Sequence, residues 1–214
     1  MCDLYSVTKP QAAIGQLAKA MVDTSGNLPA IPAVYPDKVA PVVMTRPNDG
    51  QRELLLMRWG FPSPGAKGPP QIANIRNCAS AWWRPYLRPQ QRCLVPVSSF
   101  CEYDHHAGRA VPTWFALDDT RPLFFFAGIW RGWQGTRGTK ANPVEGNHML
   151  FALLTTAPNV EVGAAHKKAM PVLLLSEADR ELWMTGAMED ALTLQRSAPD
   201  GTLKVVAVGK KEDS

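Results

Sequence analysis

The residues with the clearest chemical potential open the chain, where Cys2 follows Met1. Removal of Met1 would leave Cys2 with a free α-amine and a thiol two carbons apart. The amine has an ordinary pKa of about 8 and the thiol of about 8.5, so a fraction of each is nucleophilic at neutral pH. Together they can attack one aldehyde carbon, forming first an imine and then a five-membered thiazolidine. A chain that keeps Met1 cannot close this ring, because the amine is then part of a peptide bond.

A cysteine after the start methionine is usually an accident of sequence, so other polar residues must support such chemistry. Asn74 and Arg76 stand in a loop-like stretch, where an amide can orient a reactant and a guanidinium can pair with phosphate. They could equally be a turn asparagine beside a surface arginine. Glu102 ends an apolar strand, where burial would raise its pKa and suit acid–base work. Period-two alternation also permits an outward-facing carboxylate there. Cys101 is a rival nucleophile, although buried strand cysteines are usually inert.

A basic cluster, His166-Lys167-Lys168, precedes an apolar segment that begins at Met170. A histidine in this position can act as a general acid or base, and the lysines suit phosphate. A solvated basic loop is the competing interpretation. The pair at residues 105–106 is expected to be a solvent-exposed part of a turn.

Two segments interleave aromatic and basic residues, at 82–88 and 130–133. This combination binds single-stranded nucleic acid through base stacking and phosphate pairing. Most tryptophans are nevertheless core residues, and Trp114 and Trp183 are expected to be buried.

Hydrophobic spacing predicts the elements that must position these groups. Helices are expected at residues 11–22, with Thr8 as cap, and at 159–165, 188–194 and from 176 onward. Strands are expected at residues 40–46, 52–59, 92–103, 112–117, 122–133, 148–156, 170–175 and 203–208. Asp49-Gly50 predicts a hairpin turn between the first two strands. The Pro/Gly-rich residues 60–70 read as a connector, residues 132–146 as a mobile Gly-rich loop, and 210–214 as a charged tail. The pattern predicts one α+β domain over residues 1–214, mostly antiparallel, with a barrel-like curled sheet and peripheral helices.

Composition excludes several classes of protein. The 214 residues carry a formal net charge of +4, which is compatible with nucleic acid without proving it. No apolar run approaches a membrane span of ~20 residues, and no secretory signal stands at the start. The four cysteines form no Cys-x-x-Cys pair, which argues against a zinc or redox site. We therefore expect a cytoplasmic monomer that needs no metal or organic cofactor and has no membrane partner.

Taken together, the motifs resemble those of the SRAP family (SOS-response-associated peptidase domain). The matching residues occur in family order and span nearly the whole chain: Met1-Cys2, Arg58-Trp59-Gly60, Asn74-Ile75-Arg76, residues 92–96 leading to Glu102, and His166 before Met170-Pro171-Val172. Each motif alone is unspecific, whereas the ordered set is not.

The resemblance implies protection of abasic sites in single-stranded DNA through a covalent thiazolidine link to the N-terminal cysteine. Cys2 would then supply both nucleophiles, and Asn74 would orient the amine or the sugar. Glu102 and His166 would transfer protons. DNA contacts would come from Arg58, Trp59, Arg76, Tyr103, Lys167 and Lys168. The resemblance also implies a location on the nucleoid when the protein is bound to DNA, and it leaves open autoproteolytic removal of Met1.

The chain departs from the family pattern at three places. Asp3-Leu4 replaces the common Gly-Arg after the cysteine, Cys78 replaces a glutamate, and Tyr103 replaces a tryptophan. These changes leave the covalent chemistry intact and put the DNA geometry in question. Two rival functions remain: an N-terminal-nucleophile peptidase or amidase that uses the Cys2 thiolate, and a non-covalent binder of single-stranded DNA. Lyase activity is a further outcome, because an imine at an abasic site can also lead to strand cleavage.

Overall fold

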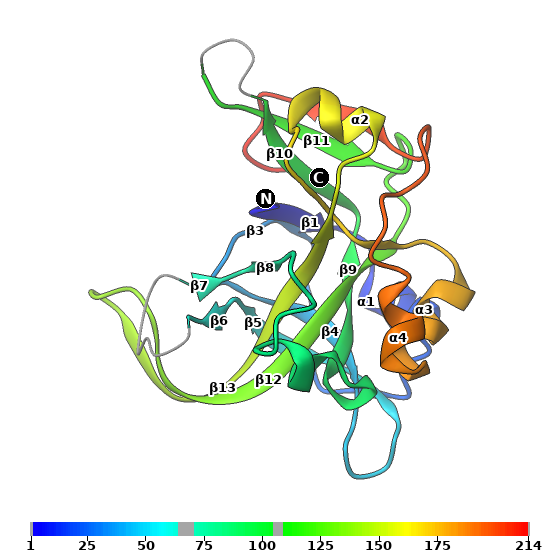
Figure 1. Ribbon diagram of the computed structural model, residues 1–214. Coiled ribbons are helices and arrows are strands. Elements are labelled where there is room, and N and C mark those ends of the chain that lie inside the picture. Colours follow the sequence, from blue (N-terminus) through cyan, green and yellow to red (C-terminus); the bar gives the residue numbers. More distant parts are fainter. Residues whose placement is uncertain (1, 64–70, 105–108, 214) are drawn as a thin grey trace.

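Two curved sheets form the frame of the chain, and helices lie at their edges and ends (Figure 1). This computed structural model describes residues 2–63, 71–104 and 109–213. The five-stranded sheet has the order β16-β11-β10-β1-β3 and is antiparallel throughout. Its strands are β1 (Leu4–Val7), β3 (Ile31–Val34), β10 (Ser99–Asp104), β11 (Val111–Ala116) and β16 (Lys204–Val208).

A nine-stranded sheet carries most of the core. Its main path is β14-β13-β12-β9-β4-β5-β2, with β15 on β12 and β8 on β13. Its strands are β2 (Val22–Asp23), β4 (Val39–Thr45), β5 (Arg52–Trp59), β8 (Asn74–Ile75), β9 (Arg92–Val97), β12 (Phe124–Gly138), β13 (Pro143–Thr156), β14 (Met170–Pro171) and β15 (Leu173–Leu174). A short third sheet pairs β6 (Phe61–Pro62) with β7 (Gln71–Ile72).

The helices are short and peripheral. They are α1 (Gln11–Ala18), α2 (Val160–Ala165), α3 (Glu177–Thr185) and α4 (Met188–Leu192), with 3-10 turns η1 (Arg84–Leu87) and η2 (Pro89–Gln91). This arrangement confirms the predicted fold class. In the described part of the chain, no helix has the length and apolar character needed to cross a membrane.

The predicted hairpin at residues 40–59 is confirmed. Strands β4 and β5 pair antiparallel, with Val43 opposite Leu54, and the turn between them contains Gly50 at a φ of 73°. Glycine adopts this left-handed conformation at no steric cost, so the Asp-Gly dipeptide fixes where the chain reverses.

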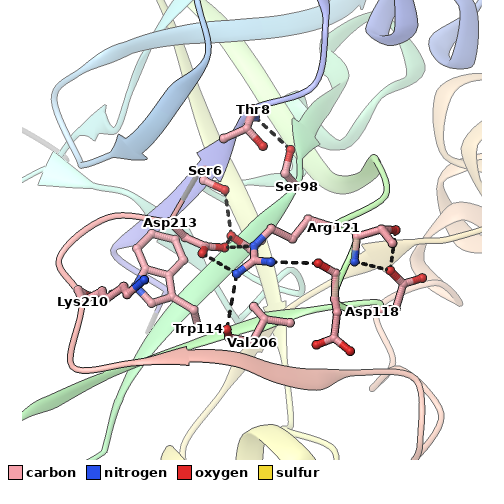
Figure 2. A network of polar contacts seen from close by, with 12 residues as sticks. Ser6, Thr8, Ser98, Trp114, Asp118, Arg121, Val206, Lys210 and Asp213 are labelled. Carbon is pink, nitrogen blue, oxygen red and sulfur yellow. Dashed lines mark hydrogen bonds and ion pairs between the residues drawn. The ribbon is translucent and has the colours of Figure 1, made fainter.

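The apolar segment at residues 92–103 is not the single strand that was predicted. It divides at Ser98 into β9 and β10, which belong to different sheets. The Ser98 amide donates to the Ser6 carbonyl at 2.8 Å, and the Thr8 amide donates to Ser98 Oγ at 2.9 Å (Figure 2). A bend of this kind lets one segment serve two packed sheets. Hydrophobic spacing does not show it, because both halves are buried.

The Gly-rich residues 132–146, predicted to be a mobile loop, instead lengthen β12 and β13 into a long twisted hairpin (Figure 1). The pairing continues without interruption from Gly132–Met149 to Gly138–Pro143. Gly135 has a packing role, because a Cβ there would lie 2.2 Å from the Trp133 ring. Composition suggested flexibility where the glycine instead makes room for an aromatic side chain.

Both ends of helix α1 differ from the prediction, whereas the start of helix α3 agrees with it. Helix α1 ends at Ala18, since Lys19 takes a left-handed φ of 54°, and no side chain caps its start at Pro10. Thr8 is therefore not the cap. Helix α3 begins with a capping box between Ser176 and Asp179.

Tryptophan burial and the segment that precedes α3 complete the core. Trp183 is buried as predicted and donates from Nε1 to the Cys93 carbonyl at 3.0 Å. Trp114 is likewise fully buried. The predicted strand at residues 170–175 is divided into β14 and β15, which pair with different strands.

Candidate active site

Four segments that are far apart in sequence bring Cys2, Asn74, Glu102 and His166 to one end of the five-stranded sheet. Cys2 immediately precedes β1, which pairs antiparallel with the Glu102 strand β10. Asn74 opens β8, which runs parallel to β13. His166 directly follows α2 as its C-cap, and this helix lies across β10 and β11 (Figure 1). The backbone pairing of these elements therefore fixes where the four side chains meet.

Cys2 is completely buried, and its thiol Sγ donates to the Leu4 carbonyl at 3.6 Å. Burial raises the pKa of the Cys2 thiol well above its ordinary value, and the negative charge of Glu102 raises it further. The thiol is therefore neutral at physiological pH. A neutral thiol next to an acid–base group suits attack late in a reaction, after another nucleophile has activated the carbon.

Asn74 holds the backbone at Cys2. Its Nδ2 donates to the Cys2 carbonyl at 2.7 Å and to Asp3 Oδ1 at 3.3 Å. The side chain is nearly buried, and its Oδ1 has no hydrogen-bond partner within the described residues. The next residue back, Ala73, accepts a hydrogen bond from Trp59 Nε1 at 3.0 Å, which fixes the entry into β8. Asn74 is thus held in place by its Nδ2, while its Oδ1 acceptor is left without a partner in the described part of the chain.

Glu102 is a buried carboxyl group whose pKa lies close to neutral pH. Burial, followed by the charge of Asp3, raises its pKa from 4.5 to about 8. His166 Nδ1 lies 3.9 Å from Glu102 Oε2, and the His166 amide donates to the Val162 carbonyl at 2.7 Å. A carboxyl group with this pKa can both give and take a proton at physiological pH.

The predicted phosphate-binding cations border this cluster. Arg76 is solvent-exposed, and its Nη1 donates to the carbonyls of Thr156 at 2.9 Å and Lys168 at 3.1 Å. Lys167 and Lys168 are exposed directly after His166. Arg76 therefore ties the Asn74 strand to the lysine loop. Tyr103 is half-buried, and its pKa is raised by burial and then by the charges of nearby groups that include Asp3.

Trp59 and Arg58 do not fit their predicted DNA contacts. The Trp59 side chain is fully buried, stacked on Phe151 with ring centroids 6.1 Å apart and edge-on to Tyr5 at 5.1 Å. It cannot offer a face to a base, so that prediction is wrong, and its role is to support the Asn74 strand from the core. Arg58 Nη1 lies 3.6 Å from Asp37 Oδ1, and Asp37 also pairs with Arg137 at 2.8 Å. Its guanidinium is thus held by Asp37 rather than by a residue of the Cys2 cluster.

Asp3 is a site residue whose role the sequence did not show. The sequence marked it only as an anion in place of an expected cation. In the fold it accepts from Asn74 and raises the pKa of Glu102. Adjacency to Cys2 was the one available signal, and it does not specify these partners.

A second missed group is the Asp213 network, formed by Ser6, Ser99, Arg121 and Asp213. Figure 2 labels Ser6, Arg121 and Asp213. Asp213 accepts from Ser99 Oγ at 2.6 Å and from Arg121 at 2.7 and 2.8 Å, while Ser99 Oγ lies 2.7 Å from Ser6 Oγ. The Asp213 amide also donates to the Pro32 carbonyl at 3.0 Å. The charged tail predicted at residues 210–214 therefore includes a buried aspartate, which is linked to β1 through the hydrogen bonds of Ser99 with Asp213 and Ser6.

The rival nucleophile and the histidine pair have different outcomes. Cys101 is buried against Leu4 and Trp114, and burial raises the pKa of its thiol to about 12, so it is chemically quiet. Residues 105–106 lie outside the described residues.

Comparisons with known proteins agree with this geometry. The sequence model of one family, SOS response associated peptidase (SRAP), matches residues 1–212. The "Abasic site processing protein YobE" of Bacillus subtilis (strain 168) is 28% identical over 160 residues, which cover 72% of this chain and 68% of that protein.

Solved structures share the fold. A protein from Bordetella bronchiseptica superposes with a TM-score of 0.73 at 22% identity, covering 97% of this chain and 98% of the other. One from Bacteroides thetaiotaomicron has a TM-score of 0.71 at 17% identity, with coverages of 95% and 90%. A phage-related protein from Bordetella bronchiseptica has a TM-score of 0.66 at 20% identity, with coverages of 95% and 92%.

Proposed function

We propose, from the premise that this chain belongs to the SOS response associated peptidase (SRAP) family, that it captures abasic sites in single-stranded DNA through Cys2. The similarity to a protein named for abasic-site processing supports this class of substrate. The product is a thiazolidine that joins the Cys2 nitrogen and sulfur to the sugar aldehyde carbon. The proposal requires a chain from which Met1 has been removed.

The observation that carries the proposal is the hydrogen bond from Asn74 Nδ2 to the Cys2 carbonyl at 2.7 Å, next to a carboxyl group of pKa about 8. The Asn74 amide holds the Cys2 carbonyl, and the amine is attached to the adjacent Cα, so this bond helps to set the direction of the amine. Preorganisation of this kind lowers the barrier for attack on a bound carbon.

The reaction divides into two additions at one carbon. The Cys2 amine attacks the aldehyde of the ring-opened sugar, and an N–C bond forms as one amine proton passes to the carbonyl oxygen. Glu102 in its acid form donates a second proton to this oxygen, which leaves as water. The proton that remains on the nitrogen then returns through His166, 3.9 Å from Glu102, to the carboxylate, which gives the neutral imine and restores the acid form of Glu102. The Cys2 thiol adds to the same carbon, and its proton passes to the nitrogen as the C–S bond forms and the ring closes.

The cations beside the cluster suit the phosphates on either side of the abasic nucleotide. Arg76, Lys167 and Lys168 are exposed around the His166 side of the site. Charge pairing of this kind positions a strand without reading its sequence. An abasic nucleotide has no base to read, so such contacts match the substrate.

The neutral thiol argues against the rival peptidase. A cysteine hydrolase needs a thiolate, whereas burial and the Glu102 charge raise the pKa of the Cys2 thiol well above its ordinary value. The amine-first order does not need an ionised sulfur, because the imine carbon is already activated.

A denaturing gel of the Met1-free protein incubated with an abasic oligonucleotide tests the proposal. We expect a shifted band with the wild-type chain and with Cys101→Ala, and no band with Cys2→Ala. Cys101 is the matched control because it is equally buried and lies on the neighbouring strand. Absence of a band from the wild-type chain would refute the proposal, and a band from Cys2→Ala would mean that another nucleophile acts. Cleaved oligonucleotide in place of an adduct would identify a lyase.

A further inference from the structure

Asp3 is the exposed neighbour of the buried Cys2, and its carboxylate shares the Asn74 amide with the Cys2 backbone. Asn74 Nδ2 donates to the Cys2 carbonyl at 2.7 Å and to Asp3 Oδ1 at 3.3 Å. An amide nitrogen carries two N–H groups, so both donors are engaged. The terminal torsion of an asparagine side chain is broad, and one hydrogen bond would leave the amide free to rotate about it. The second bond, to Asp3, fixes the plane of the amide.

The fixed plane also determines where the Asn74 oxygen lies. Asn74 is 9% exposed, and its Oδ1 is buried without a hydrogen-bond partner among the residues that the structure describes. Rotation of the amide by half a turn would bring this oxygen against the Cys2 carbonyl and the Asp3 carboxylate, which are both acceptors. The Oδ1 is therefore kept away from them and remains available to a donor that binds beside Cys2.

Asp3 and Glu102 come opposite each other at the ends of two paired strands. The antiparallel register ends with Leu4 opposite Cys101, so the next residues along the two chains are Asp3 and Glu102. Residues placed directly opposite in such a pair have Cβ atoms about 4.5–5.5 Å apart and share one face of the sheet. Burial, and then the charge of Asp3, raises the pKa of Glu102 to about 8. Two negative charges so placed repel each other, so an ionised Asp3 favours the acid form of Glu102.

We propose that Asp3 is a positioning residue for the capture of the abasic site: its carboxylate fixes the Asn74 amide beside Cys2 and opposes a second negative charge at Glu102. This inference rests on the proposed function. It assigns to Asp3 an effect on the rate of the reaction, although Asp3 is not required to touch the reacting atoms.

The charge of Asp3 also has a cost in affinity for DNA. The exposed cations Arg76, Lys167 and Lys168, which are proposed to pair with phosphates, border the same cluster. A carboxylate beside them repels a phosphate, and at 4–6 Å in water this repulsion weakens binding by up to ~5-fold. Asp3 therefore acts in opposite directions on the binding of DNA and on the reaction that follows.

Other ionisable side chains surround the two carboxyl groups: Cys2, Cys101, Tyr103 and His166. Burial raises the pKa of the Cys101 thiol to about 12, and it raises the pKa values of the Cys2 thiol and of Tyr103 above their ordinary values. These three groups therefore stay neutral near physiological pH. His166 is the same in the wild-type chain and in every Asp3 variant, so a comparison between them isolates the effect of Asp3.

Single-turnover adduct formation by the Met1-free protein tests the proposal, with protein concentration varied at several pH values between about 6 and 9. The maximum rate of the wild-type chain should follow a bell, which rises as the Cys2 amine loses its proton and falls as Glu102 loses its own. Asp3→Asn keeps an oxygen acceptor for Asn74 and removes the charge. Both limbs of the bell should move to lower pH, because a nearby negative charge favours the protonated form of both groups. The half-saturating protein concentration should fall by up to ~5-fold at low salt.

Asp3→Ala removes the acceptor as well as the charge. Its maximum rate should be roughly 10-fold lower than that of Asp3→Asn at every pH, because the Asn74 amide loses its second hydrogen bond. The matched controls are Asp119→Asn and Asp119→Ala, which remove the same charge from a side chain that is 79% exposed. They should leave the bell and the maximum rate unchanged.

The outcomes separate this inference from the proposed function. A bell that does not move in Asp3→Asn, a half-saturating concentration that does not fall, or equal maximum rates in Asp3→Ala and Asp3→Asn would overturn the inference. The same changes in the Asp119 variants would also overturn it. In each of these cases the wild-type adduct would leave the proposed function standing, whereas a wild-type chain that forms no adduct would refute the proposed function itself.

Discussion

Replacing Glu102 with glutamine should remove a pH dependence of stability that the wild-type chain carries. The Glu102 pKa rises from 4.5 in the unfolded chain to about 8 in the fold, because the carboxyl group is buried and lies near Asp3. Below pH 4.5 the group is protonated in both states and does not destabilise the fold. Between these two values the folded state keeps a proton that the unfolded state has lost, so the free energy of unfolding falls as pH rises.

The free energy of unfolding falls by roughly 5 kcal/mol in total, and this fall is complete above about pH 8. Glutamine has nearly the same shape and no ionisation in this range, so the Glu102→Gln variant should lack this slope. It should be less affected by a change from pH 5 to pH 8 and more stable than the wild-type chain at the upper end.

Urea unfolding under reducing conditions at several pH values between 5 and 8 measures the effect. The quantity to compare is the difference between wild-type and variant free energies of unfolding at each pH. Asp119→Asn is the matched control, because this carboxylate has a side chain that is 79% exposed. Parallel curves for the wild-type chain and Glu102→Gln would refute the raised pKa and, with it, the acid role at neutral pH.

Four further experiments test the site and its support. Glu102→Gln and His166→Ala should each slow adduct formation roughly 100-fold or more in a single-turnover gel assay, and unchanged rates would remove their proton-transfer roles. Asn74→Ala should slow it too and lower stability by ~1–2 kcal/mol in thermal unfolding, because the Cys2 carbonyl loses its donor; wild-type kinetics would contradict the orienting role. Trp59→Phe should lower the free energy of unfolding by about 1 kcal/mol, because the hydrogen bond to Ala73 is lost. Its affinity for undamaged DNA should be unchanged, and a large loss of affinity would mean that Trp59 does contact a base. Asp213→Asn should lower stability by roughly 1–3 kcal/mol, because Arg121 loses a charged partner, and an unaltered melting temperature would exclude a bracing role.

Local signals in the sequence were sufficient for many elements of the fold. The Asp49-Gly50 turn predicted the β4–β5 hairpin, and Ser176 with Asp179 marked the start of α3. What escaped was non-local. The bend at Ser98 depends on pairing with Ser6, and the long β12–β13 hairpin depends on the Trp133 ring crossing Gly135. Neither contact is visible in the spacing of one segment.

The candidate site shows the same division. The order of the family motifs predicted that Cys2, Asn74, Glu102 and His166 form one site. In the fold, Asn74 donates to the Cys2 carbonyl, and His166 lies beside Glu102. The burial of individual side chains could not be predicted from the order of the motifs. Trp59 stands in a motif beside an arginine, yet its side chain is in the core, because β5 is covered on that face by Phe151 and Tyr5. Asp3 gained its role only through a residue seventy-one positions away.

The Asp213 network has a consequence for the order of events during synthesis. Ser6 meets Ser99 across 93 residues, and Ser99 meets Asp213 across a further 114. The first strand therefore cannot take its braced position until nearly the whole chain has left the ribosome. The Asp213 network therefore closes last, so an enzyme that removes Met1, as the proposed function requires, would have the whole time of synthesis to act before β1 is braced.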